Sequence, residues 1–142
     1  MVVFADALRE RYERFSRGDL EGAVDLWTDD FVWEGTLDLL TEDSYRSDSF
    51  ALPGSERHEG KQAAIEALQR WLSAWDSFEI TPDDFVENGH TVLMLGHTRV
   101  VKDEQARTLP ALHICSFRDD GRQDGVRILT DTRVSAKLLG IG

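Results

Sequence analysis

The stretch from Arg11 to Trp33 constrains the fold more than any other part of the sequence. Apolar residues recur at helical spacing before and after Gly18, which predicts two short amphipathic helices. Gly18 can take the left-handed conformation that ends a helix, and Asp19 is placed to cap the next one. Asp29-Asp30 then predicts a turn before the start of a strand. The two apolar stripes consist of Phe4, Leu8, Tyr12 and Phe15, and of Leu20, Ala23, Val24 and Trp27.

A third helix and several strands are predicted farther along the chain. The segment 60–75 carries a helical stripe, and the sequence after it alternates as strands do over residues 78–85, 91–101, 109–117 and 126–130. Pro82 predicts an edge strand or a bulge, and Asn88-Gly89 is typical of a hairpin. Helices followed by antiparallel strands predict an α+β fold. The stripe of the third helix consists of Ala64, Ile65, Leu68, Trp71, Leu72 and Trp75.

The segment from Gly35 to Glu59 is long and polar, and Pro53-Gly54 interrupts it. Loops of this length are uncommon inside a compact domain unless they have a function. The segment is therefore either a lid over a pocket or a tolerated surface insertion.

Composition excludes several classes of partner. The 142 residues are 41% hydrophobic and carry a net charge of −11, so a sizeable core is expected and nucleic acid is not an expected partner. The same charge disfavours an anionic membrane surface, and no apolar run has membrane-spanning length. The N-terminus lacks the order of a signal peptide, and the single cysteine, Cys115, fits a reducing compartment. A cytoplasmic protein is expected.

The predicted helices and first strand resemble the opening of the nuclear-transport-factor-2-like superfamily, and within it the SnoaL-like polyketide cyclases and their ketosteroid-isomerase relatives. The segment TLPALHICSFRDDGR (residues 108–122) is similar to the family's penultimate strand. The resemblance covers the whole length, 1–142, as a single domain. It implies a cone-shaped barrel, in which a curved, mainly antiparallel sheet wraps around three N-terminal helices and encloses a pocket. It also implies a homodimer through the outer face of the sheet, for which apolar residues on both faces of 109–117 give some support.

His113 is the first candidate for catalysis. It lies in the middle of an apolar strand, where a neutral imidazole can serve as a general base or as a donor to an oxyanion. The resemblance implies that this position faces the pocket, because SnoaL-like cyclases carry a histidine there and ketosteroid isomerases carry a protonated aspartate. The alternative is a core histidine satisfied by a neighbouring hydroxyl or backbone group.

His97 and Arg99 form a second candidate pair on the preceding strand. Residues two apart on a strand share a face, so both point the same way. Limonene-epoxide-hydrolase-like relatives use an arginine and an aspartate at such a spacing, but the aspartate has no counterpart here. A two-residue turn at Glu104-Gln105 would point His97 away from His113, whereas one residue more or fewer would bring both to one face. The alternative is a solvated or dimer-forming face.

The catalytic aspartate and tyrosine of the ketosteroid isomerases have no identical counterparts at the corresponding positions of this sequence. Their proton-abstracting aspartate corresponds to Gly35, so Glu34 or Asp38 would have to replace it. Their hydrogen-bonding tyrosine corresponds to Arg11, although Tyr12, the next residue, lies on the apolar stripe and is a candidate for the pocket.

The acid partner of the SnoaL-like histidine is also missing. The resemblance places that aspartate near Ile128 on the last strand. Asp131 lies three residues later and is expected to cap a helix over 132–139, with a catalytic role as the alternative.

Three tryptophans indicate a class of ligand. Large aromatic surfaces at Trp33, Trp71 and Trp75 suit flat or polycyclic molecules such as aromatic polyketides. The alternative for each is core packing, which we favour for Trp71 and Trp75 taken singly.

The sequence contains no motif for metal binding, for a nucleophilic serine or for nucleotide binding. The four histidines and one cysteine show no metal-ligand spacing, and His58 and His90 fall in predicted loops. No Gly-x-Ser-x-Gly elbow or Walker-type loop is present. No metal and no cofactor are therefore expected, and Cys115 is predicted to be a buried, inert thiol.

The first functional hypothesis is a cofactor-independent SnoaL-like enzyme that cyclises or isomerises a hydrophobic, carbonyl-bearing metabolite. His113 would be its acid/base or oxyanion partner, with Glu34 or Asp38 as a second group and Tyr12, Trp33, Trp71, Trp75, His97 and Arg99 around the substrate. The first alternative is a non-catalytic module that binds a small molecule or a partner. The second is an epoxide hydrolase that uses Arg99. A carboxylate beside His113 would favour catalysis, and an isolated His113 would favour binding.

Overall fold

A computed structural model describes residues 4–35 and 57–140. Asp38 lies outside the described residues, as do all of residues 36–56, which are most of the segment expected to be either a lid or a surface insertion. In chain order the elements are α1 (Phe4–Ser16), α2 (Leu20–Ala23), β1 (Trp27–Glu34), β2 (His58–Glu59), α4 (Lys61–Ser73), β3 (Ser77–Asn88), β4 (Thr91–Lys102), β5 (Gln105–Phe117), β6 (Gln123–Thr130) and α5 (Thr132–Leu138).

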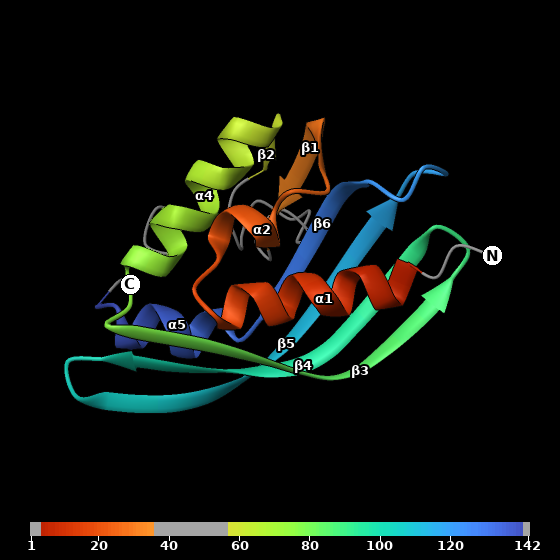
Figure 1. The fold of residues 1–142 in the computed structure, drawn as a ribbon. Coiled ribbons are helices and arrows are strands. Elements are labelled where there is room, and N and C mark those ends of the chain that lie inside the picture. Colours follow the sequence, from red (N-terminus) through yellow and green to blue (C-terminus); the bar gives the residue numbers. More distant parts are fainter. Residues whose placement is uncertain (1–3, 36–56, 141–142) are drawn as a thin grey trace.

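The break between α1 and α2 follows the prediction. Gly18 has a φ of +81°, the left-handed conformation that glycine adopts readily. The side chain of Asp19 then accepts a hydrogen bond from the Gly22 amide at 2.9 Å and so caps α2. These two residues turn the chain back, and α1 lies across one face of the sheet (Figure 1).

The start of β1 differs from the prediction. Trp27 is the first residue of the strand and not the end of a helical stripe, and Asp29-Asp30 lies within the strand and not in a turn. Trp27 pairs with Gln123 and Val32 pairs with Gly125, so the stretch of β1 between them is irregular and longer than its partner. The rings of Trp27 and Phe31 stack with centroids 3.9 Å apart. A regular strand would separate residues four apart by about 13 Å, so the irregular stretch of β1 brings the two rings together.

The six strands form one curved sheet in the order β2-β1-β6-β5-β4-β3 (Figure 1). All neighbours are antiparallel except β1 and β6, which are parallel. The sheet is mixed, curved and not closed into a barrel, since β2 and β3 remain as separate edges. The predicted α+β class is confirmed, with helices α1, α2 and α4 on the same side of the sheet.

The hairpins settle the register that the sequence left open. The β4–β5 turn consists of Asp103 and Glu104, with φ angles of +50° and +67°. It has two residues, as one alternative required, but begins one position earlier than Glu104-Gln105. Met94 therefore pairs with His113, and Gly96 pairs with Ala111. On the other side of β4, the register shifts between Pro82 and Asp84, so Pro82 marks both a bulge and an edge strand, as predicted.

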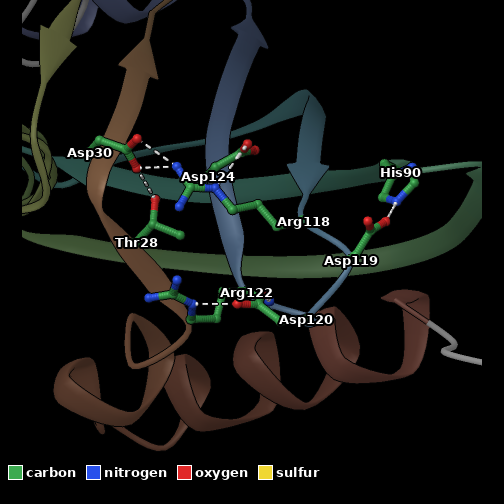
Figure 2. Close-up of polar contacts among 8 residues, drawn as sticks. All are labelled: Thr28, Asp30, His90, Arg118, Asp119, Asp120, Arg122 and Asp124. Carbon is green, nitrogen blue, oxygen red and sulfur yellow. Dashed lines mark hydrogen bonds and ion pairs between the residues drawn. The ribbon is translucent and has the colours of Figure 1, made fainter.

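Charged side chains hold the irregular start of β1 against the turn between β5 and β6 (Figure 2). Arg118 contacts both carboxylate oxygens of Asp30 at 2.5 Å, and Thr28 donates to the same carboxylate at 2.7 Å. Arg118 also lies 3.7 Å from Asp124. The hydroxyl of Thr28 and the guanidinium of Arg118 lower the pKa of Asp30. This network fixes β1 where it borders β6.

Apolar side chains of helices and sheet meet in two clusters. The larger one joins Phe4 and Leu8 of α1 to Phe31 and Trp33 of β1 and to the inner faces of β4, β5 and β6. The smaller one consists of Trp75, Val100 and Leu109, covered by side chains of α5 and its C-terminal end. Asp131 caps α5 by accepting from the Val134 amide at 3.0 Å, as predicted. No helix in the described ranges has the length and apolarity needed to span a membrane.

Candidate functional site: an apolar cavity with a tyrosine–histidine pair

A partly open cavity of about 110 Å³ lies between the helices and the sheet. Its volume is of the order of the ~150 Å³ apolar cavity that holds one benzene ring in an engineered protein. Its enclosed part therefore takes about one aromatic ring. The lining residues are Leu8, Arg11, Tyr12 and Phe15 of α1, Ala23 and Val24 near α2, Trp27 and Trp33 of β1, Leu68 and Trp71 of α4, Phe78 and Ile80 of β3, His113 of β5, and Gln123, Val126 and Ile128 of β6.

A hydrogen bond joins Tyr12 and His113, which both line this cavity. The Tyr12 hydroxyl lies 2.6 Å from Nδ1 of His113, although the two residues are 101 positions apart in sequence. Their rings are also stacked, with centroids 5.8 Å apart. Helical spacing puts Tyr12 on the inner stripe of α1, and strand alternation puts His113 on the inner face of β5.

Burial keeps both side chains neutral near pH 7. It lowers the pKa of His113 to about 4, so the imidazole carries no charge. Burial also raises the pKa of Tyr12 well above its usual value, so the phenol keeps its proton. Two neutral groups can form this bond in two ways: the phenol donates to Nδ1 and the imidazole proton lies on Nε2, or Nδ1–H donates to the phenol oxygen. In the first form, Nε2–H is a second donor on a side chain that lines the cavity.

Cys115 lies beside this pair on the same face of β5. Its thiol interacts with the Tyr12 hydroxyl and with the buried Gln123, and burial raises its pKa to about 12. A thiol that stays protonated is a poor nucleophile. The cysteine therefore has the inert, buried environment that the sequence predicted.

The described part of the cavity wall contains no carboxylate. Ile128 pairs directly with His113, at the position where the resemblance placed the acid partner of the cyclases. Glu34 follows Trp33 and so points to the other face of the sheet. There it pairs with Arg57 and, at 3.2 Å, with Arg127. Glu34 therefore does not reach the cavity, and His113 has a phenol for its partner where an acid was expected.

His97 and Arg99 also lie on the outer face of the sheet. His97 pairs with Pro110 in the β4–β5 register, and its Nδ1 lies 2.9 Å from the carboxylate of Asp83. Because β4 alternates, Arg99 shares this outer face while Met94 faces inward with His113. The structure does not bring either residue to the cavity, so Arg99 is not available there for an epoxide-hydrolase mechanism.

The three candidate tryptophans have different environments. Trp33 and Trp71 line the cavity, whereas Trp75 is 5% exposed and packs with Val100 and Leu109 in the smaller core cluster. Trp75 lies beside Trp71, with ring centroids 5.4 Å apart, but it follows the last turn of α4 and does not line the cavity. The aromatic wall of the cavity is completed by Trp27, Phe15 and Phe78, which the sequence analysis did not assign to a site.

Arg11 is the other cavity residue that sequence reasoning missed. Its side chain is only 13% exposed, and its Nε lies 2.8 Å from Asp25 without the alignment of a hydrogen bond. Its position carried a signal, because Arg11 is three residues after Leu8 and four before Phe15 on the inner stripe.

A model of the SnoaL-like domain family matches residues 8–123, and the chain therefore belongs to the SnoaL-like family. No curated protein matches the sequence. Three clustered metal-binding side chains, of the kind that hold an ion, do not occur within residues 4–35 and 57–140.

Solved structures share the fold. TerC co-crystallised with polyporic acid is 20% identical, with 96% of this chain and 98% of that chain covered and a TM-score of 0.79. An NTF2-like protein from Burkholderia pseudomallei K96243 is 24% identical, with 98% of each chain covered and a TM-score of 0.80. A protein described as a SnoaL-like polyketide cyclase, from Shewanella denitrificans OS-217, is 15% identical, with 95% and 96% covered and a TM-score of 0.67. At these identities the likeness shows the fold alone.

The half-buried imidazole predicts a specific pH dependence of stability. The pKa of His113 is lowered to about 4 in the folded protein, so the unfolded chain binds a proton first as the pH falls below about 6.5. This residue then destabilises the fold increasingly between about pH 6.5 and pH 4, by about 3 kcal/mol in total. Urea unfolding of wild type and His113→Asn across this range measures the effect. Wild type should lose more stability than the variant, and parallel profiles would contradict a neutral buried imidazole.

Proposed function

We propose that the protein is a cofactor-independent enzyme that binds a hydrophobic, carbonyl-bearing small molecule and promotes its cyclisation or isomerisation. The carbonyl oxygen accepts a hydrogen bond from Nε2 of His113, and aromatic side chains such as Trp33 and Trp71 hold the flat apolar part. No metal and no cofactor takes part in this proposal.

The hydrogen bond between the Tyr12 hydroxyl and Nδ1 of His113 is the observation that carries the proposal. It holds the imidazole ring in one orientation. With the phenol as donor, the imidazole proton lies on Nε2, and a donor is ready before the substrate arrives. A donor fixed in advance costs no reorganisation when charge develops on the substrate.

A neutral imidazole suits the stabilisation of an oxyanion better than the removal of a proton. With a pKa of about 4, His113 is a weak base near pH 7, but its Nε2–H can donate to an enolate or alkoxide as negative charge forms. In an aldol cyclisation that charge accumulates on the carbonyl oxygen under attack. Because no described cavity residue is a carboxylate, the best substrate is one whose own C–H is already acidic, such as a 1,3-dicarbonyl compound.

The relatives are consistent with such a substrate. The chain belongs to the SnoaL-like family, and one structural neighbour was crystallised with polyporic acid while another is described as a polyketide cyclase. The low identity of these neighbours leaves the reaction to be established on this chain itself.

A non-catalytic binding module is the second candidate. The observation in its favour is the cavity wall, where His113 meets a phenol and no carboxylate among the described residues. This candidate retains the aromatic cavity and the hydrogen bond to the ligand but predicts no acceleration of any proton transfer.

The two candidates differ in the exchange of carbon-bound protons. We expect the protein to bind 2-indanone, a compact aromatic ketone, and to accelerate exchange of its α-protons with solvent deuterium, because a hydrogen-bonded carbonyl stabilises the enolate. His113→Asn should slow the enzyme-dependent exchange by about 100-fold, and Tyr12→Phe by about tenfold through loss of the fixed tautomer. Proton NMR in deuterium oxide measures the exchange rate.

His97→Asn is the matched control, because His97 lies on the outer face and contacts Asp83. This variant should exchange at the wild-type rate. Unchanged exchange in His113→Asn would refute the role of this histidine. Binding of the ketone without any acceleration would support the binding module.

We also propose that two copies associate through the outer face of the sheet. Leu93 and Leu95 of β4 pair with Ile114 and Leu112 of β5, and Leu112 pairs in turn with Leu129 of β6, so these side chains share the face opposite the cavity. Leu95 is 40% exposed, which is unusual for a large apolar residue on a structured strand.

A charge in this outer patch should separate the copies. Wild type should elute with twice the 16.1 kDa mass of the chain, and Leu95→Glu should shift it to the monomer mass because an unpaired carboxylate cannot be buried cheaply. Size-exclusion chromatography with light scattering measures both masses. A monomeric wild type would contradict the proposed dimer and leave the cavity proposal unaffected.

A further inference from the structure

Arg11 introduces a positive charge into a cavity that is otherwise apolar. It is the only side chain among the described lining residues that is charged at neutral pH, because His113 is neutral there. Its Nε and Nη1 are buried and have no hydrogen-bond partner within the described chain. A guanidinium cannot lose its charge in a protein, so burying it without acceptors is costly unless a ligand supplies them.

Arg11 is not needed to tie α1 to the segment after α2. Arg14, one helical turn later, donates an aligned hydrogen bond to Asp25 at 2.9 Å and another to Glu10 at 2.8 Å. Arg11 has only the misaligned contact with Asp25 and a 3.8 Å approach to Glu10. Arg14 therefore already makes the aligned ion pair with Asp25, whereas Nε and Nη1 of Arg11 have no hydrogen-bond partner within the described chain.

The negative net charge of the protein strengthens the argument that Arg11 binds an anion. A net charge of −11 repels anions on average, so an anionic ligand requires a cation placed locally at its site. Guanidinium groups match carboxylate-like oxygens with paired N–H donors, and such bonds are strong where water is excluded.

We infer that Arg11 binds an anionic oxygen of the ligand, so that the cavity selects flat aromatic or enolic acids over their neutral analogues. The inference rests on the proposed function, since it concerns the ligand of the same cavity. Arg11 holds the ionised carboxylate or enolate oxygen, while Nε2 of His113 donates to a carbonyl oxygen and the aromatic wall takes the rings. A substrate bound as its enolate would also explain why the described wall contains no carboxylate base.

A pair of isosteric probes separates charge recognition from apolar binding. 2-Naphthoate and 2-naphthamide have the same rings, but only the first is an anion. We expect wild type to bind 2-naphthoate at least about tenfold more tightly, and Arg11→Met to lower that affinity by about tenfold while leaving the affinity for 2-naphthamide within about twofold. Isothermal titration calorimetry at constant ionic strength measures all four affinities.

Arg14→Met is the matched control, because Arg14 shares Asp25 and Glu10 with Arg11 but does not line the cavity. It should leave both affinities unchanged. Arg11→Lys should retain part of the preference for the anion, which guards against a loss of fold in Arg11→Met. Equal losses for both probes, or no loss for 2-naphthoate, would overturn the role of Arg11 and leave the cavity proposal standing. Failure of wild type to bind either probe would overturn the proposed function and this inference with it.

Discussion

The hydrogen bond between Tyr12 and His113 is the interaction on which the functional account depends. It joins the inner stripe of α1 to the inner face of β5 at 2.6 Å, and it connects the helical layer to the sheet inside an apolar cavity. Burial keeps the phenol protonated and the imidazole neutral, so neither partner of the bond carries a charge. In the proposed form of the bond the phenol is the donor, which places the imidazole proton on Nε2 of a side chain that lines the cavity.

The rest of the fold supports this arrangement. Gly18 and Asp19 return the chain so that α1 covers the sheet, and the bulge beside Pro82 accompanies the bend of its edge strands. The ion pairs of Arg118 hold the irregular start of β1, which places Trp27 and Trp33 on the cavity side. Ile128 pairs with His113 at the position where the resemblance implied an acid partner, which supports the proposal of hydrogen-bond donation over proton removal.

Much of the fold could be predicted from the sequence, and the reasons are local. The helical spacing of apolar residues predicted α1 and α4, and the capping preferences of aspartate predicted the roles of Asp19 and Asp131. These signals are readable because they depend on residues only a few positions apart. The start of β1 was predicted wrongly because Trp27 fits a helical stripe as well as it fits a strand that begins with a bulge. The face of β4 on which His97 lies depended on the length of the β4–β5 turn. Asp103 and Glu104 adopt positive φ angles in this turn, and the sequence contains no glycine there that would indicate its position.

The partner of His113 could not be predicted, because Tyr12 meets it only through tertiary packing and the resemblance directed attention to carboxylates. Arg11 was visible at helical spacing but had no role in the isomerase pattern. The central claim is that His113 is neutral with its proton on Nε2. Long-range proton–nitrogen NMR of the histidine rings near pH 7 tests it most directly. The account predicts an unprotonated Nδ1 resonance and a protonated Nε2 resonance for His113, with the pattern disturbed in Tyr12→Phe. A doubly protonated ring, or a proton on Nδ1, would contradict it.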